Sequence, residues 1–304
     1  MQDIYLFGSI VVTTGLMLEK SYPNPDDYAE LSQINTFVGG ECGVAAAILN
    51  HFGCSCKVIG FQLGYETDPI IKSYYKNTLV DISCQTTDFN WIGIRDYVII
   101  DAINHTRTCL GSFEHLYTMN EHHWDMPKEE DIASSSVAGV DPHFCPEMDM
   151  TVYLCHKHNV PYVTYDCGYD SDLHKKSAIN VISSCYLRDK YPEFMESRID
   201  ELLALYTHNS KGLTIFTFGS DSVLYGRDDN FFSDQPFKLN IKSTLGAGDS
   251  FRTGCIYGLL HKMNDHEIVR FASATAGCAL QQYPITSYLP ELSDIMNLYT
   301  NSFR

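Results

Sequence analysis

The sequence predicts an α/β fold: a doubly wound, mainly parallel sheet with helices on both faces, together with a small β lid. Three observations predict it. In the second half of the chain, short apolar runs typical of buried strands alternate with longer helical patterns. The first half opens on a similar buried run at residues 4–7, which ends in a glycine. Between residues 79 and 117 the pattern is short and β-like, which favours a lid outside the main sheet.

In the first half, two buried strands enclose a helix of small residues. The strands are expected at residues 4–7 and 56–61, and the helix at residues 42–53, where a glycine closes its C-terminal end. The polar residues 19–27 contain two prolines and are expected to form a loop. Lid strands are expected at residues 91–94, 97–101 and 106–110.

In the second half, strands alternate with helices. Strands are expected at residues 135–140, 162–166, 179–182 and 213–219, helices at residues 147–158 and 194–206 and from Ser250 and His266, and a hairpin around Gly226. This alternation predicts right-handed βαβ units and a parallel sheet, whose ligands bind beyond the carboxyl ends of the strands. We expect residues 1–304 to form a single domain, with lid strands from about residues 10–36 and 85–117.

Composition and charge exclude several classes of partner. The chain carries 38 acidic and 21 basic residues, a formal net charge of −17. This acidic excess argues against nucleic acid and against an anionic membrane surface as partners. The sequence has no basic secretory start and no stretch of eighteen apolar residues, so we expect a soluble, cytoplasmic protein. Its eleven cysteines form no repeated Cys-x-x-Cys pattern and are expected to be reduced, buried thiols.

The most informative motif is a glycine-rich turn at residues 243–251. Gly246 and Gly248 allow positive φ and a close backbone approach to a ligand, and the residues that follow have helical spacing. The amides of residues 246–249 are then expected at a helix N-terminus, where unpaired N–H groups and the helix dipole favour a phosphate. Asp249 falls in the first turn of this helix. An acid there can simply stabilise the helix, by about 0.3–1 kcal/mol, or it can act chemically.

This motif resembles the C-terminal signature of the ribokinase-like (PfkB) carbohydrate kinases, Asp-Thr-x-Gly-Ala-Gly-Asp-x-Phe, which residues 244–251 match apart from the free positions. The resemblance implies that Asp249 is the base that takes the proton of the sugar hydroxyl. It also implies that the amides of Gly246, Ala247 and Gly248 form an anion hole for the transferring phosphate of ATP. Both roles suit phosphoryl transfer, which needs alignment and charge stabilisation more than covalent chemistry.

A second match concerns the nucleotide. Residues 217–220 follow an expected core strand and resemble the family's Thr-x-Gly element, which lies along the nucleotide phosphates. The resemblance implies that Thr217, Gly219 and Thr244 bind the nucleotide. An ordinary junction between a strand and a turn is the alternative for the first two.

A third match concerns the acceptor. Gly39 and Gly40 precede the small-residue helix, as a Gly-Gly pair beside the sugar does in the family. Arg107 falls where lid residues of the family reach a substrate or phosphate, although a solvated strand arginine is the alternative. Together with Thr13, near the end of the first strand, these residues are the expected substrate-binding positions.

The chain also departs from the family. Thr13 stands where an Asp commonly holds sugar hydroxyls, and Val44 stands where an Asn is usual. These changes imply a different acceptor, because a site built to bond a hydroxyl discriminates strongly. Ser183 and the residues after it replace the Asn-x-x-Glu element that organises magnesium, and Ser243 replaces an Asp near a monovalent-cation site. Mg²⁺ is then expected to be held mainly through the nucleotide phosphates, and potassium activation is left open.

Several charged residues near these motifs have two interpretations. His122, His123 and His143 lie close to acids in the sequence, but their spacing is not that of a helical metal site, so we expect exposed histidines and no metal ligands. Asp141 and His143 follow an expected strand and can also border the sugar pocket. Arg252, three residues after Asp249, either complements phosphate charge or pairs with a surface acid.

The sequence therefore favours an ATP-dependent kinase that phosphorylates a hydroxyl, preferably a primary one, of a small sugar or sugar derivative. A nucleoside kinase of the same superfamily is the second hypothesis, since apolar residues such as Val11 and Val44 can line a base pocket. The third is a catalytically weak relative that binds a metabolite. Exposed lid strands can also pair edge to edge into a homodimer.

Overall fold

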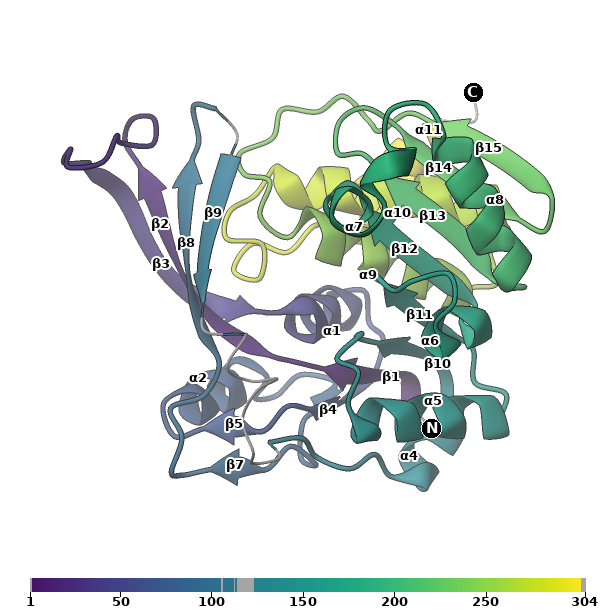
Figure 1. The fold of residues 1–304 in the computed structure, drawn as a ribbon. Helices are drawn as coiled ribbons and strands as arrows, with labels where there is room; N and C mark the ends of the chain where they lie inside the picture. The colour runs from purple at the N-terminus through teal and green to yellow at the C-terminus, as the bar shows by residue number, and fades with distance from the viewer. Residues whose placement is uncertain (1, 105, 112, 114–122, 302–304) are drawn as a thin grey trace.

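The computed structural model describes residues 2–104, 106–111, 113 and 123–301. It contains a large sheet flanked by helices and a second, four-stranded sheet, which stands apart at the left of Figure 1. The parts of the expected lid at residues 105, 112 and 114–117 lie outside the described residues.

Nine of the described strands form the main sheet, in the order β15-β14-β13-β12-β11-β10-β1-β4-β6. They are β1 (Gln2–Gly8), β4 (Cys56–Gly60), β6 (Val80–Asp81), β10 (Ser135–Val140), β11 (Tyr162–Tyr165), β12 (Ile179–Ser183), β13 (Leu213–Thr217), β14 (Val223–Arg227) and β15 (Asn230–Asp234). Neighbours from β13 across to β6 pair in parallel, whereas β14 and β15 add an antiparallel hairpin at one edge. The doubly wound, mainly parallel sheet is therefore confirmed.

Helices cover both faces of this sheet (Figure 1). They are α1 (Glu41–His51), α2 (Thr67–Tyr74), α4 (Glu129–Ala133), α5 (Pro146–Lys157), α6 (Asp172–Lys176), α7 (Ser184–Lys190), α8 (Ile199–Asn209), α9 (Ala247–Leu260), α10 (Asp265–Leu280) and α11 (Leu292–Asn301). Residues of α1, α9, α10 and α11 pack on one face, and residues of α4 to α8 pack on the other. No helix in the described part of the chain is long and apolar enough to cross a membrane.

The core follows from the alternation of side chains along each strand. In β1, Ile4 and Leu6 pack against the α1 and α9 side, while Tyr5 and Phe7 pack against the α4 and α5 side. All four are fully buried. Because helices cover both faces of the sheet, these strands are continuous runs of apolar residues in the sequence. Such runs are easily predicted as buried strands.

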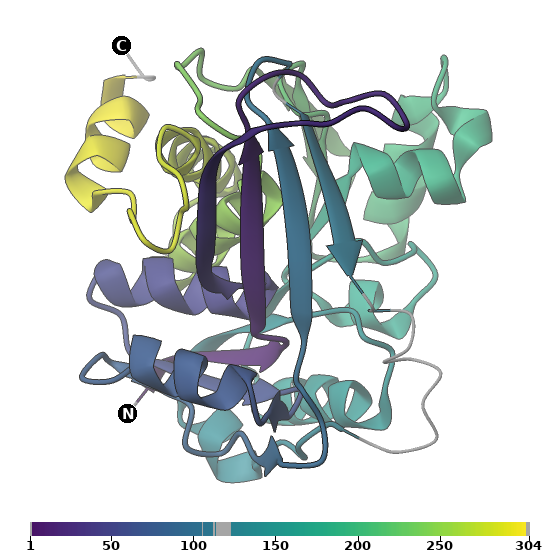
Figure 2. The same ribbon diagram turned by 90° about the vertical axis from the view of Figure 1, so that its left-hand side faces the viewer.

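The second sheet is made of β3 (Leu31–Gly39), β2 (Val11–Leu18), β8 (Arg95–Asp101) and β9 (Thr106–Gly111), in that spatial order. β2 and β8 pair in parallel, and the outer strands pair antiparallel to them. In Figure 2 this sheet lies in front of the rest of the fold. Below it, two short strands, β5 (Leu63–Gly64) and β7 (Thr87–Asp88), pair with each other.

Several expected elements differ from the structure. The expected strand at residues 91–94 is irregular, because Gly93 has φ of +99° and its backbone packs directly on Gly64. The helix expected from residue 194 begins at Ile199, after a separate 3₁₀ turn at Pro192–Phe194 whose Phe194 packs on Tyr191. The hairpin expected around Gly226 turns two residues later, between β14 and β15.

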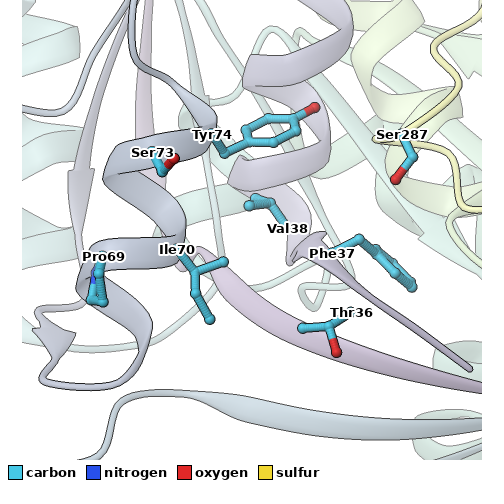
Figure 3. Close-up of a pocket in the computed structure, with 8 residues that line it drawn as sticks. All are labelled: Thr36, Phe37, Val38, Pro69, Ile70, Ser73, Tyr74 and Ser287. Carbon is cyan, nitrogen blue, oxygen red and sulfur yellow. The ribbon is translucent and has the colours of Figure 1, made fainter.

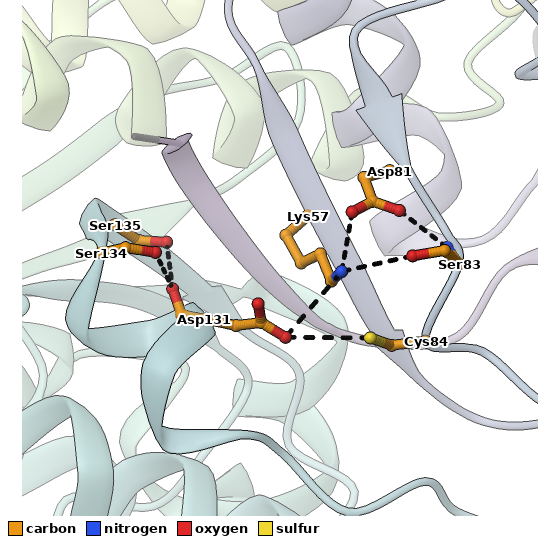
Figure 4. A network of polar contacts seen from close by, with 7 residues as sticks. All are labelled: Lys57, Asp81, Ser83, Cys84, Asp131, Ser134 and Ser135. Atoms are coloured by element: carbon orange, nitrogen blue, oxygen red, sulfur yellow. Dashed lines mark hydrogen bonds and ion pairs between the residues drawn. The ribbon is translucent and has the colours of Figure 1, made fainter.

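A buried lysine on β4, Lys57, links the edge strand β6 to α4 (Figure 4). Lys57 Nζ lies 2.7 Å from Asp81 Oδ2 on β6 and 3.9 Å from Asp131 Oδ2 on α4. It also donates to Ser83 Oγ at 3.4 Å, and Cys84 Sγ lies 3.8 Å from Asp131 Oδ2. Burial lowers the pKa of Lys57, but these partners outweigh burial and raise it above its ordinary value. The network lies near the start of β4, away from the carboxyl ends of the strands.

Candidate functional site

A cavity of about 630 Å³ lies between the lid and the carboxyl ends of the main-sheet strands. Ser9 follows β1, His143 follows β10, Asp166 follows β11, and Ser183 and Thr217 end β12 and β13; all five line it. The lid contributes residues of β2, β3, β8 and β9 from the other side. This is the position at which a doubly wound sheet binds its ligands.

A second pocket, of about 500 Å³, lies between α2 and the end of β3 (Figure 3). Its lining consists of Thr36, Phe37, Val38, Pro69, Ile70, Ser73, Tyr74 and Ser287. These side chains are apolar or hydroxyl-bearing, and none carries a charge. The groups able to do acid, base or phosphate chemistry therefore belong to the larger cavity.

The glycine-rich turn forms the floor of the cavity at the start of α9. Gly246 is the N-cap residue with φ of +79°, a conformation that strongly favours glycine, and a Cβ there would also lie 2.7 Å from Ile285 Cδ1. The next amides bond weakly or not at all: Ala247 N lies 3.4 Å from Thr244 O, and the N–H groups of Gly248 and Asp249 have no acceptor among the described residues. The helix N-terminus therefore presents open donors to the cavity.

Asp249 lines the cavity within this first turn. Burial, and then the nearby Glu41 carboxylate, raise the pKa of Asp249 to about 7, although Arg252 acts in the opposite direction. A carboxylate whose pKa lies near neutrality is well suited to accept a proton at physiological pH.

Beneath Asp249, Arg252 forms a buried ion pair with Asp141. Arg252 Nη1 lies 2.5 Å from Asp141 Oδ1, and the two side chains are 2% and 0% exposed. Burial, the largest single effect, would raise the pKa of Asp141, but Arg252, His143 and Cys42 together outweigh it and hold the pKa below its ordinary value. The interpretation of Arg252 as the partner of a surface acid is therefore wrong, because its partner is one of the most buried acids in the protein.

Two glycines make room for this pair. A Cβ at Gly139 on β10 would lie 3.0 Å from Arg252 Nη2, and a Cβ at Gly8 on β1 would overlap the Asp141 carboxylate. The guanidinium group also lies over the ring of Tyr165, with its Cζ 4.9 Å from the ring centroid.

The expected acceptor residues lie together on the lid side of the cavity. Thr13, Gly39, Gly40 and Arg107 all line it. Gly40 has φ of +81° and leads directly into α1, and a Cβ at Gly39 would overlap the Thr13 hydroxyl. Arg107 reaches across from β9 to the turn, where its Nη1 donates to Thr244 O at 2.9 Å and Thr244 Oγ1 at 3.2 Å.

The expected nucleotide residues are less closely grouped. Thr217 lines the cavity at the end of β13. Thr244 lies behind the turn, in contact with Arg107, and Gly219 follows β13 with φ of +65° outside the cavity lining. Nothing lies within 4 Å of a Cβ built on Gly219, so its surroundings are open.

Three acids of the cavity were not identified from the sequence. They are Glu41 at the start of α1, Asp96 on β8 and Asp166 after β11. Asp166 has φ of +40° and accepts from Ser183 N at 2.6 Å and Ser183 Oγ at 2.9 Å. The position of Asp166 directly after a buried strand is a sequence signal that indicates a site residue. Asp96 lies inside a lid strand, where the sequence carries no such signal.

The histidines differ from the expectation of exposed side chains. His123 is only 4% exposed, stacks on Trp91 and lies 3.4 Å from Asp88, so that expectation is wrong for it. His143 is largely buried in the cavity wall against Trp124, with a side chain 11% exposed, so it is not an exposed histidine either. His122 lies outside the described residues.

Most of the cysteines follow the expectation of buried thiols. All eleven cysteines are free, and seven are buried as expected, but Cys109 and Cys185 are exposed and line the cavity. Among the described residues, no group of three or more His, Cys, Asp or Glu side chains is arranged to hold a metal ion.

The site fits a nucleotide phosphate better than a metal held by protein ligands alone. Open amides at a helix N-terminus are a favourable phosphate site. Mg²⁺ commonly binds through one or two carboxylates together with substrate phosphates and water, and Asp166, which lines the cavity beside Ser183 at the end of β12, is the carboxylate that would serve there.

Comparison with known proteins agrees with this arrangement. Residues 193–292 match the model of the pfkB family carbohydrate kinases, and this segment contains the glycine-rich turn and α9. A 5-dehydro-2-deoxygluconokinase from Bacillus anthracis is 28% identical over 90 residues, which are 30% of this chain and 27% of that protein. The match thus spans about a quarter of the length of this curated relative.

The whole chain resembles solved ribokinase structures. A putative ribokinase from Agrobacterium tumefaciens aligns with a TM-score of 0.85 at 17% identity, over 99% of this chain and 98% of that one. A ribokinase from Arabidopsis thaliana, complexed with ribose and ATP, aligns with a TM-score of 0.79 at 14% identity, over 98% and 99% of the two chains. At these identities the likeness shows the fold. Together with the matched segment, it confirms the resemblance found from the turn.

The Arg252–Asp141 pair leads to a stability prediction. Replacing Arg252 with Met leaves the Asp141 charge buried and unpaired, so the free energy of unfolding should fall by about 3–5 kcal/mol. The double variant Arg252→Met/Asp141→Asn removes both charges and should recover at least half of that loss. Urea unfolding followed by circular dichroism measures both. A double variant as unstable as the single one would mean that packing, and not charge pairing, is the main role of Arg252.

Proposed function

We propose that this chain, whose residues 193–292 match the model of the pfkB family carbohydrate kinases, transfers the γ-phosphate of ATP to a hydroxyl, preferably primary, of a small sugar or sugar derivative. The observation that carries the proposal is the start of α9. There, amides without protein acceptors and the carboxylate of Asp249 face one cavity.

In the proposed reaction, the acceptor hydroxyl oxygen attacks the γ-phosphorus while Asp249 takes its proton. The new bond joins this oxygen to phosphorus, the bond to the β–γ bridging oxygen breaks, and ADP leaves. The amides of Gly246, Ala247 and Gly248 receive the charge that builds on the transferring group. Mg²⁺, bound through the nucleotide phosphates, would neutralise charge on them.

The nucleotide is proposed to lie along the ends of β12 and β13. Thr217 lines that end of the cavity, Gly219 lies two residues further along the chain, and Thr244 bonds to Arg107 beside the turn. Asp166 and Ser183 occupy the region of the missing Asn-x-x-Glu element, and their mutual hydrogen bonds hold the start of α7 against β11.

The acceptor is proposed to lie under the lid, against Thr13, Gly39, Gly40 and Arg107. A nucleoside acceptor is the second candidate, because Val11, Phe37 and Val44 give the same side of the cavity an apolar wall. Turnover of nucleosides but of no free sugar would favour it. The third hypothesis, a catalytically weak metabolite-binding relative, requires that no acceptor be phosphorylated.

The lid strands are the proposed site of a homodimer. Strand register places Tyr97 and Leu110 side by side on the face of the lid opposite Thr13 and Arg107. Ile34 lies on the same face, in the neighbouring row of side chains. These three side chains are 48%, 50% and 64% exposed. All six residues of the edge strand β9 are exposed as well, so a second copy can cover this surface.

Asp249→Asn should lower turnover by at least about 10²-fold and leave ATP affinity nearly unchanged, because the base acts in the transition state. Steady-state ADP formation and ATP binding by calorimetry measure the two effects. Asp200→Asn, which removes an exposed acid from the first turn of α8, is the matched control and should retain activity. A large loss of ATP binding in Asp249→Asn would make Asp249 a metal ligand or a structural residue.

The raised pKa of Asp249 predicts a pH dependence. The base must be ionised, so kcat/KM should rise with pH and level off above an apparent pKa near 7. Since Glu41 contributes to the upward shift, Glu41→Gln should move this limb to lower pH. A profile that is flat between pH 5 and 8 would contradict the assignment of Asp249 as base.

The proposed dimer is tested by sedimentation. The wild-type protein should sediment as a dimer at micromolar concentration, and Ile34→Glu/Leu110→Glu should sediment as a monomer, because it places charge on the apolar lid face. Tyr153→Glu, which alters an exposed aromatic residue on α5, should stay dimeric. A monomeric wild-type protein would refute the lid interface.

A further inference from the structure

The cavity has an unusual balance of charge. Four carboxylates line it, those of Glu41, Asp96, Asp166 and Asp249, against the two guanidinium groups of Arg107 and Arg252. The positive charge of Arg252 is already matched by Asp141 beneath the floor. Arg107 directs its Nη1 to the carbonyl and hydroxyl oxygens of Thr244. Carboxylates therefore outnumber guanidinium groups in the cavity lining.

Asp96 is the acid of the cavity whose carboxylate most clearly lacks a hydrogen-bond partner at one oxygen, within the described part of the chain. It pairs in register with Thr13 on β2, and the Thr13 hydroxyl bonds to its carboxylate. Its Oδ1 atom is buried and has no hydrogen-bond partner among the described residues. Burial raises the pKa of Asp96 despite the Thr13 contact, so its surroundings do not offset its charge. A buried acceptor atom without a partner is costly and is usually satisfied by a ligand or by water.

Glu41 adds a second uncompensated acid on the same side. It begins α1 directly after Gly40, lines the cavity, and makes no ion pair within the described part of the chain. It lies close enough to Asp249 to raise the pKa of that carboxyl, which shows that the two charges repel. Asp166 differs, because both of its oxygens accept from Ser183.

A neutral sugar would satisfy the hydrogen-bonding capacity of these acids but not their charge. An acidic sugar would add to the repulsion. A protonated amine offers both donors and an opposite charge, and a charged hydrogen bond in a partly buried site is roughly twice as strong as a neutral one. Negative charge close to the acceptor thus selects against anions and in favour of cations.

We propose that the acceptor carries a protonated amino group, held by Asp96 and Glu41 on the lid side of the cavity, so that the substrate is an amino sugar or an amino-substituted polyol. This inference rests on the proposed kinase function for its reaction, but the recognition of the amine is a separate property of the lid-side acids.

The test uses acceptor pairs that differ in one group. ADP formation is measured at pH 7 with D-glucosamine against D-glucose, with 1-amino-1-deoxy-D-fructose against D-fructose, and with D-gluconate as the anionic sugar. In at least one pair the amine should have a kcat/KM at least tenfold above that of its neutral counterpart, and gluconate should be the poorest acceptor. If neither pair shows this preference for the amine, or if gluconate is the best acceptor, the inference is overturned and the kinase proposal is left standing.

Variants assign the preference to residues. Asp96→Asn should reduce the amine preference to less than about threefold, mainly through the KM of the amine, and Glu41→Gln should reduce it in part. Asp200→Asn, which removes an exposed acid on α8 outside the cavity lining, is the matched control and should keep both the activity and the preference. Melting temperatures of all three variants show whether each is folded. An undiminished preference in a folded Asp96→Asn overturns the assignment to Asp96.

Binding without ATP separates the two proposals. Calorimetric titration of the wild-type protein with the preferred amine should give saturable binding that Asp96→Asn weakens at least tenfold. If this binding is present but no acceptor yields ADP, the kinase proposal fails and the inference stands. If no amine binds and none is turned over, the inference fails.

Discussion

The ion pair between Arg252 and Asp141 is the interaction around which the site is built. It joins α9 to the end of β10, and it fits only because β1 and β10 carry glycines where a side chain would collide with it. A buried pair of this kind contributes little net stability, yet losing either partner is costly. Its position one turn below Asp249 means that the same contact fixes where the carboxylate and the open amides of α9 lie.

The floor and the lid wall of the cavity carry different kinds of group. The floor, at the start of α9, holds groups suited to phosphoryl transfer in general: donors at a helix terminus and a carboxylate with a pKa near neutrality. The lid wall holds the groups proposed to contact the acceptor, among them Thr13 and Asp96. Separating the two allows the lid to change its side chains while the reaction centre is kept, which is how one fold accommodates many substrates.

Local patterns in the sequence predicted the local structure. Gly246, Gly248 and Asp249 lie within four residues of one another, so their turn was recognisable, and β1 and α1 follow from continuous apolar and small-residue runs. What could not be predicted depends on contacts between distant segments. Asp141 lies more than a hundred residues before Arg252, and Asp96 meets Thr13 only through the parallel pairing of β2 and β8. His123 was misjudged for the same reason, because its burial is created by Trp91 and Phe61.

The contact between Arg107 and Thr244 has a consequence for how ligands enter. It joins the lid edge to the residue that precedes the glycine-rich turn, across 137 positions of the chain. If β9 swings outward, both hydrogen bonds are lost together, and the turn loses its tether at the same moment. The lid and the glycine-rich turn are therefore mechanically coupled: a molecule that fills the space under β9 also steadies the backbone that is proposed to receive the phosphate.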